Sequence, residues 1–186
     1  MAQTRTYGAR GKLQVRAYPE AASQSFKKGD FLTVDSNGRA QLAAAAGSSV
    51  GATTATLNNL ANRIIGRAEA DASGTTGKML PVLLVEGSEF LLPVWHGTPS
   101  SAVPNTNQIG KTYELKYVSG SPNYWAIDIS ATTNPKFKIT DMQPGALGHD
   151  GWDGSGYPTA ASTVQYGVVW GTFIDDFSAA GDGVYA

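Results

Sequence analysis

The chain has 186 residues, enough for one domain that buries about two-thirds of the surface its unfolded form exposes. Its 22 glycines and its 16% content of charged residues are typical of a turn-rich protein with few charged helix faces, so the composition predicts an all-β domain. Zero cysteines exclude disulfides, and a formal net charge of −1 argues against a dedicated nucleic-acid binder.

The sequence contains no membrane or secretion signal. It has no run of about 18 strongly apolar residues, so we expect no membrane partner. The first 20 residues lack the apolar stretch of about 7 to 15 residues that a secretion signal requires. We therefore expect synthesis in a host cytoplasm, and the lack of cysteine agrees with a reducing compartment.

The charges are unevenly placed along the chain. Residues 1–78 hold ten of the 14 Lys and Arg against five acids, a net charge of +5, whereas residues 79–186 hold four bases against ten acids, a net charge of −6. This distribution reflects either chance on a solvated surface or two regions that contact different partners.

Residues 1–20 are predicted to form an extended N-terminal arm, followed by a single β-rich domain over residues 21–186. Polar and apolar residues alternate over residues 12–17, so this segment can add as a strand to the sheet edge of another protein. The alternative is that it forms the first strand of the chain's own sheet, and phosphate binding by its cations is a third interpretation. The candidate contact residues are Arg5, Arg10, Lys12, Leu13, Val15 and Arg16.

Residues 32–42 predict a β-hairpin. Asn37 and Gly38 tolerate the positive φ of a tight turn. A two-residue loop would mix apolar and polar side chains on each face, whereas a three-residue loop with Gly38 in the left-handed conformation pairs Asp35 with Arg39. We predict this second register, in which one face carries Leu32, Val34, Ala40 and Leu42.

The next segments predict a loop and two strands. Residues 43–61 are small and uncharged and contain at most one short helix, around residues 57–61. In residues 64–70, Gly66 and the alternating alanines form a narrow face that another backbone can approach closely. Residues 80–85 are apolar on both faces and predict a central, buried strand.

Residues 90–95 predict a strand at the edge of a sheet, because Pro93 lacks the N–H that a central strand needs. An exposed apolar edge is an aggregation risk unless another subunit covers it. We therefore expect self-association through this strand. The candidate interface residues are Phe90, Leu92, Val94 and Trp95.

The C-terminal part continues the β pattern. Residues 97–108 are a Pro/Ser/Asn loop, predicted to be a contact loop and the only plausible internal boundary. Residues 113–117 and 125–129 alternate apolar and polar side chains and predict a second hairpin. Further strands are predicted at residues 137–139 and 164–174.

No residue pattern predicts catalysis, a cofactor or a metal site. Only two histidines are present, and without cysteine a zinc site lacks its usual ligands. The Gly-rich segment 149–156 has two Asp, too few for a tight calcium site, and lacks the EF-hand spacing. We predict a protein that is not an enzyme, in which His96 forms a hydrogen bond at a strand end.

The aromatic content supports a second hypothesis. Four Trp and eight Tyr are present, and Trp152 and Tyr157 are candidate surface contacts. Aromatic side chains in β-domains are more often core or interface anchors than stacking platforms for sugars. A carbohydrate-binding or adhesion module, in which these aromatic side chains stack on sugars, is accordingly the alternative function and not the first one.

Several short motifs follow one another in a particular order across residues 26–175. They are Gly29-Asp30 before a strand, Gly38 in a turn, Ile64 to Ala68, Gly77 before Leu80 to Val82, and segments 109–115, 125–128 and 137–141. This order and spacing resemble the capsid decoration proteins of tailed bacteriophages, also called cement or head-stabilising proteins.

The resemblance implies a compact β-barrel or β-sandwich of the β-tulip kind, and the sequence leaves barrel and sandwich open. It implies a structural protein on the outer capsid surface of a virion, where an N-terminal arm often adds as a strand and the protein bridges neighbouring capsomers. The implied partners are the major capsid protein and two further copies of the chain, as a homotrimer at three-fold or quasi-three-fold positions. A tail or neck component shares the β-rich composition and stays open as a third function.

Overall fold

The computed structural model describes residues 8–43, 64–98, 101–104, 106–118, 123–133, 135–142 and 167–174. These ranges contain β-strands and one 3₁₀ turn, Thr106–Gln108, so the predicted all-β class is confirmed. The strands are Ala9–Gly11 (β1), Val15–Pro19 (β2), Phe31–Val34 (β3), Ala40–Leu42 (β4), Gly66–Ala68 (β5), Met79–Leu84 (β6), Ser88–Trp95 (β7), Thr112–Val118 (β8), Tyr124–Asp128 (β9), Phe137–Met142 (β10) and Val168–Phe173 (β11).

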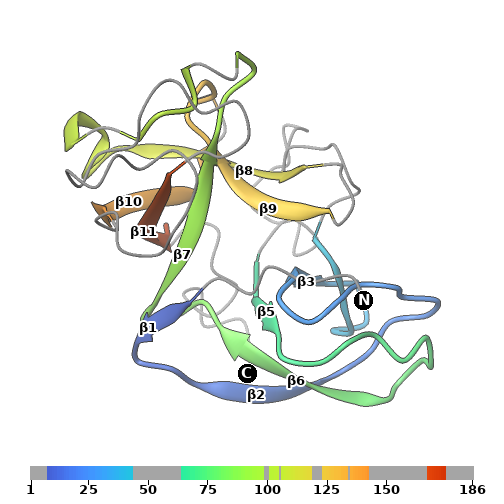
Figure 1. The fold of residues 1–186 in the computed structure, drawn as a ribbon. Helices are drawn as coiled ribbons and strands as arrows, with labels where there is room; N and C mark the ends of the chain where they lie inside the picture. Colours follow the sequence, from blue (N-terminus) through green and yellow to red (C-terminus); the bar gives the residue numbers. More distant parts are fainter. Residues whose placement is uncertain are drawn as a thin grey trace.

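Five strands close into a barrel in the upper half of Figure 1. The order is β7-β11-β10-β8-β9, and β9 returns to pair with β7 in parallel at Val94 and Trp95. All other pairings in the ring are antiparallel. The short β1 adds to the beginning of β7, outside the ring.

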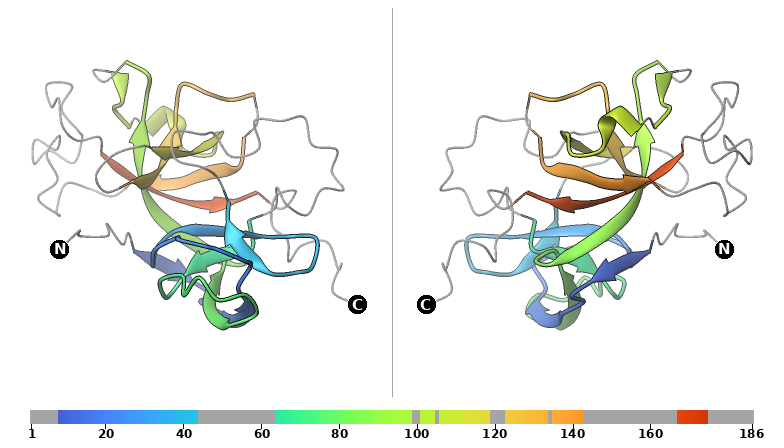
Figure 2. Two further views of the ribbon diagram at one scale, coloured as in Figure 1. Left: turned by 90° about the vertical axis from the view of Figure 1, so that its right-hand side faces the viewer. Right: turned by 90° about the vertical axis from the view of Figure 1, so that its left-hand side faces the viewer.

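The second sheet has the order β2-β6-β5-β3-β4 and is antiparallel throughout. Its two outer strands are linked by an isolated parallel bridge between Glu20 and Ala40, in which the N–H of Ala21 donates to the Ala40 carbonyl at 2.9 Å. The barrel and this sheet form two stacked layers in the side views of Figure 2. The choice between barrel and sandwich is thus resolved as a barrel with a second sheet beside it.

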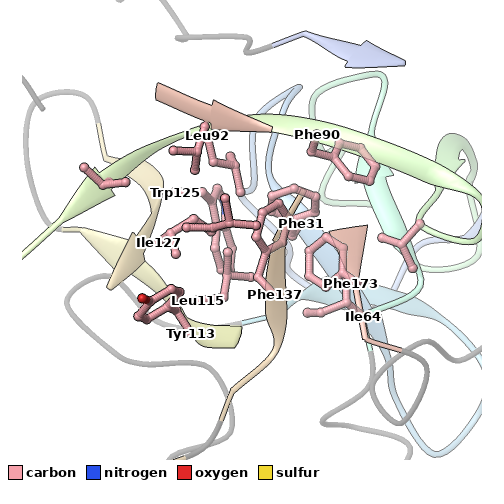
Figure 3. Packing of buried hydrophobic residues seen from close by; sticks show 14 of the residues in the cluster. Phe31, Ile64, Phe90, Leu92, Tyr113, Leu115, Trp125, Ile127, Phe137 and Phe173 are labelled. Atoms are coloured by element: carbon pink, nitrogen blue, oxygen red, sulfur yellow. The ribbon is translucent and has the colours of Figure 1, made fainter. Parts of the chain in front are cut away.

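One hydrophobic core joins the two layers. Phe31 of β3 packs its ring edge against Phe90, Phe173 and Trp125 of the barrel, with ring centroids 5.0–5.4 Å apart. Figure 3 shows these rings together with Leu92, Ile127 and Leu115 of the barrel strands and with Ile64. The second sheet also encloses a smaller cluster of its own, formed by Phe26, Leu32, Val34, Ala40, Ile65, Ala68, Leu80 and Val82.

The hairpin prediction is confirmed in its register. Leu32 pairs with Leu42, Thr33 with Gln41 and Val34 with Ala40. Gly38 has φ +71°, and Asp35 pairs with Arg39 through a backbone bond of 2.8 Å and a side-chain ion pair of 3.0 Å. The apolar face packs into the core of the second sheet, as the alternation requires.

The prediction that residues 90–95 form an edge strand is wrong. β7 pairs with β11 along one side and with β1 and then β9 along the other. The N–H of Val94 donates to Gly167, so in the antiparallel alternation the nitrogen of Pro93 points away from β11. It falls in the gap between β1 and β9, where no ladder bond is lost.

The predicted free arm is also wrong for residues 8–20. β1 pairs with β7, and β2 pairs with β6 over Val15–Pro19. The alternative, that this segment forms strands of the chain's own sheets, is the one observed. Periodicity alone does not separate the two, because an alternating strand suits an internal partner and an external one equally well.

The positions of the remaining predicted strands agree with the structure where it describes them. β6 is central, and β8 and β9 form the second hairpin. In β11 the side chains of Val169 and Phe173 are buried on one face while Trp170 and Thr172 are partly exposed on the other. The proposed short helix at residues 57–61 and the loop at residues 149–156 lie outside the described residues.

Candidate protein-binding surface

The outer side of β2 and β6 is apolar and exposed to solvent. Ala17 pairs with Pro81, and Pro19 pairs with Met79, so these side chains share one face of the ribbon. Val15 is 59% exposed, Met79 57% and Leu13, just before the strand, 53%. We call Leu13, Val15, Ala17, Met79 and Pro81 the β2–β6 face.

The local sequence explains why the β2–β6 face is exposed to solvent. In β6 the alternate residues Leu80 and Val82 turn into the core of the second sheet, so Met79 and Pro81 must lie on the opposite side. Tyr18 of β2 packs against the same core cluster. The exposed apolar face extends along β6 only as far as Pro81, because Leu83, which pairs with Val15 on the same side, is buried in the core that joins the two layers.

Three cations flank this face without an ion pair among the described residues. Lys12, Arg16 and Lys78 are exposed, and none joins the ion pairs that the structure describes. Most other described cations, such as Lys27 and Lys28, meet an acid of this chain. The β2–β6 face thus combines apolar side chains with bordering cations that form no ion pair among the described residues.

A buried carboxylate fixes the turn that carries Lys78 and leads into β6. Glu20 accepts hydrogen bonds from the N–H and hydroxyl of Ser73 at 2.9 and 2.7 Å and from the N–H of Gly74 at 2.7 Å. Burial alone would raise the pKa of Glu20, but these donors together with the charge of Lys78 lower it below its ordinary value. The carboxylate therefore holds the start of β6 in place while ionised.

Some of the predicted arm residues lie on or beside the β2–β6 face, and others do not. Lys12, Leu13, Val15 and Arg16 belong to the β2–β6 face or its border. Arg10 instead forms ion pairs with Glu89 and Asp141 and lies 4.4 Å from the ring centroid of Trp170. Its hydrogen bond to Glu89 is the main cause that raises the pKa of Arg10. Arg5 lies outside the described residues.

Three of the four predicted interface residues of β7 are not on the surface. Phe90, Leu92 and Val94 are buried in the core to exposures of 1%, 3% and 0%. Trp95 is half-buried, with the Lys116 ammonium 3.8 Å from its ring centroid. The prediction of a subunit interface is therefore wrong for Phe90, Leu92 and Val94 and stays a prediction for Trp95. Trp152 and Tyr157 lie outside the described residues.

A small pocket opens in the gap between β1 and β9. Its lining includes Gly8, Leu91, Tyr124, Trp125 and the carboxyl of Asp30. Burial raises the pKa of Asp30 despite hydrogen bonds from the Lys27 N–H and from Trp125 Nε1. These donors already engage both carboxylate oxygens, so the arrangement joins the two layers.

A second buried charged cluster lies on the outer side of the barrel. Glu114 and Asp128 are opposite each other in the β8–β9 ladder, and both are buried. Lys116 Nζ is 3.6 Å from Asp128. Burial lowers the pKa of Lys136 to about 8, and Glu114 opposes that shift. The like charges of the ladder are thus balanced by lysines.

The described residues contain no group of three or more His, Asp or Glu placed to hold a metal ion. His96 accepts the Thr98 N–H at Nδ1 over 2.9 Å, at the end of β7, as expected from sequence. Within the same ranges, no helix has the length and apolarity needed to cross a bilayer.

Sequence reasoning missed the contribution of β6 to the surface. The sequence predicts burial on both faces over residues 80–85, whereas Pro81 is exposed; Met79, which is also exposed, lies just before this range. The available signal was Pro81 itself, since a proline interrupts the continuous branched apolar run that is typical of a doubly buried strand. The pairing with β2, which lies more than 60 residues earlier, has no local signal.

No family model, curated protein or solved structure matches this chain.

Proposed function

We propose that the protein is a structural decoration protein, which binds the outer surface of a tailed-phage head and holds neighbouring capsomers together. The motif order described above supports this proposal. The observation that carries it is the β2–β6 face, because an exposed apolar surface bordered by cations without an ion pair in the described ranges is suited to binding another protein. The major capsid protein is the proposed partner, and the virion surface the proposed location.

The proposal places capsid contact on a folded surface instead of a free arm. A preformed face loses less conformational entropy on binding than a disordered segment does. A homotrimer would present three such faces, and linked contacts of this kind gain on the order of 10² to 10⁴ in avidity. Separating two capsomers would then require breaking several contacts at once.

Co-sedimentation with heads purified from the phage that encodes the chain tests this proposal. The wild-type protein should pellet with the heads, and a Val15→Asp, Met79→Asp double variant should bind at least ten-fold more weakly, because charges then interrupt the apolar face. Ile109→Asp is the matched control, since Ile109 is also a large apolar side chain, 43% exposed, but lies on the turn before β8. Its binding should match the wild type.

Two results would contradict the proposal. If mass spectrometry of purified virions does not detect the protein, the proposed location on the virion surface is wrong. Equal binding by the double variant, the control and the wild type would remove the β2–β6 face as the contact surface.

A further inference from the structure

One edge of β2 pairs with no strand of the described residues, and the hydrogen-bond pattern defines which edge this is. The N–H of Glu20 donates to the Lys78 carbonyl at 2.9 Å, and the N–H of Leu84 donates to the Gln14 carbonyl at 2.8 Å. Antiparallel ladders alternate, so the even-numbered residues of β2 direct their backbone groups toward β6. The N–H and C=O groups of Val15 and Ala17 therefore point away from it.

No strand of the described ranges covers this edge. β2 pairs with β6, and its other side is linked to β4 only beyond the strand, at Glu20. Val15 and Ala17 are both exposed. Pro19 is also an odd-numbered residue of β2, so its nitrogen points away from β6 and the missing N–H removes no hydrogen bond to that strand. The edge offers two N–H groups, of Val15 and Ala17, that have no partner within the described part of the chain and lie next to exposed apolar side chains.

We propose that the β2 edge accepts an extended, acidic strand from a partner protein, by addition to the second sheet. This inference rests on the proposed function and specifies how the β2–β6 face is used. Backbone hydrogen bonds to Val15 and Ala17 would supply affinity, and side chains would supply selectivity. A carboxylate opposite Arg16 would neutralise a cation that has no ion pair among the described residues.

Charge favours such a partner over a second copy of this chain. A second copy would bring Lys12, Arg16 and Lys78 to the same edge, and antiparallel pairing centred on Arg16 would place two guanidinium groups opposite each other. Pairing of two copies would also leave both apolar faces side by side in solvent. The fitting strand alternates, with acidic residues on the Arg16 side and apolar residues beside Val15 and Ala17.

A peptide-binding experiment with one backbone variant tests this inference. Ala17→Pro removes an outward N–H while the bonds to β6 stay, and Ala17→Ser is the matched control that keeps the N–H. The probe is a seven-residue peptide of alternating valine and glutamate, and binding is followed through the amide signals of residues 13–18 in NMR spectra at low salt. The peptide should shift the Val15 signal in the wild type and in Ala17→Ser, and bind at least ten-fold more weakly to Ala17→Pro.

A charge exchange keeps the test independent of how well the proline variant folds. Arg16→Glu should lose the valine–glutamate peptide and gain a valine–lysine peptide, which the wild type should not bind. Equal binding of both peptides to the wild type, or binding that is unaffected by either variant, would overturn the inference. Sedimentation velocity provides a further check. If the wild type forms a dimer and Ala17→Pro abolishes it, the β2 edge binds a second copy of the chain, and the inference is overturned.

The outcomes separate this inference from the proposed function. If Ala17→Pro binds phage heads as well as the wild type, the edge is not used and the inference fails, although the capsid role stands. If heads bind no form of the protein while the acidic peptide still selects the β2 edge, the capsid role fails and the inference stands.

Discussion

Asp30 is the residue that most directly ties the two layers together. It precedes β3 of the second sheet, and its Oδ1 accepts the Nε1–H of Trp125 from the barrel at 3.0 Å. Its Oδ2 accepts the Lys27 N–H at 2.8 Å, and Tyr117 adds a further side-chain hydrogen bond. A buried carboxylate with these donors fixes the position of β3 against β8 and β9.

We predict that Asp30→Ala lowers the free energy of unfolding by about 2–4 kcal/mol, because buried donors of Trp125 and Tyr117 lose their acceptor. The pH dependence gives a second test. Since burial raises the folded-state pKa of Asp30, the folded protein holds this proton more tightly than the unfolded chain. Its contribution to stability therefore falls as pH rises from about 3.8 through the folded-state pKa.

The measurement is urea unfolding between pH 3.5 and 7. The destabilisation caused by Asp30→Asn should shrink as pH rises, because the variant lacks this titration. Asp71→Asn is the control with the opposite sign, since the backbone N–H of Lys28 lowers the pKa of Asp71. Parallel curves for Asp30→Asn and the wild type would contradict the assignment.

At the scale of elements, β5 lies in the middle of the second sheet although it has only three residues. Gly66 makes this possible. A Cβ at this position would overlap the carbonyl oxygen of Leu83, and would lie 2.5 Å from Cγ1 of Val82. The narrow face that the sequence predicts over residues 64–70 is therefore a close approach of β5 to β6.

We predict that Gly66→Ala destabilises the protein by about 1–3 kcal/mol or more, because the overlap is with backbone that has no room to shift. Thermal unfolding measures the effect. Gly97→Ala is the matched control, since its Cβ would meet only the Trp95 ring at 3.8 Å. A Gly66→Ala protein with the melting temperature of the control would show that the strands separate readily.

The elements that local chemistry determines were predicted correctly. The turn at Gly38 and the alternation on both sides of it specify the hairpin register without help from distant residues. The position of β7 was not predictable in this way. Proline does avoid positions that need a ladder hydrogen bond, and Pro93 follows this rule. Its nitrogen lies between β1 and β9, which both pair with the same side of β7, and only the topology reveals this gap.

For the whole molecule, the sequence predicted the fold class from composition and turn spacing, but not which strands meet. β1 and β2 are three residues apart in sequence and join different sheets, because β1 pairs with β7 about 80 residues later and β2 pairs with β6 about 65 residues later. The β2–β6 face could be predicted only in part for the same reason. Leu13 and Val15 follow from their pattern, whereas Met79 reaches them only through long-range pairing.

The order of the strands in the ring also bears on how the chain folds as it leaves the ribosome. All strands of the second sheet lie within residues 15–84, so this layer has its partners early in synthesis. The ring cannot close until β11 has been made, because β11 lies between β7 and β10 and ends at Phe173. Phe31 therefore lacks its contact with Phe173 until β11 has been synthesised, and closure of the ring is a late step that joins strands far apart in sequence.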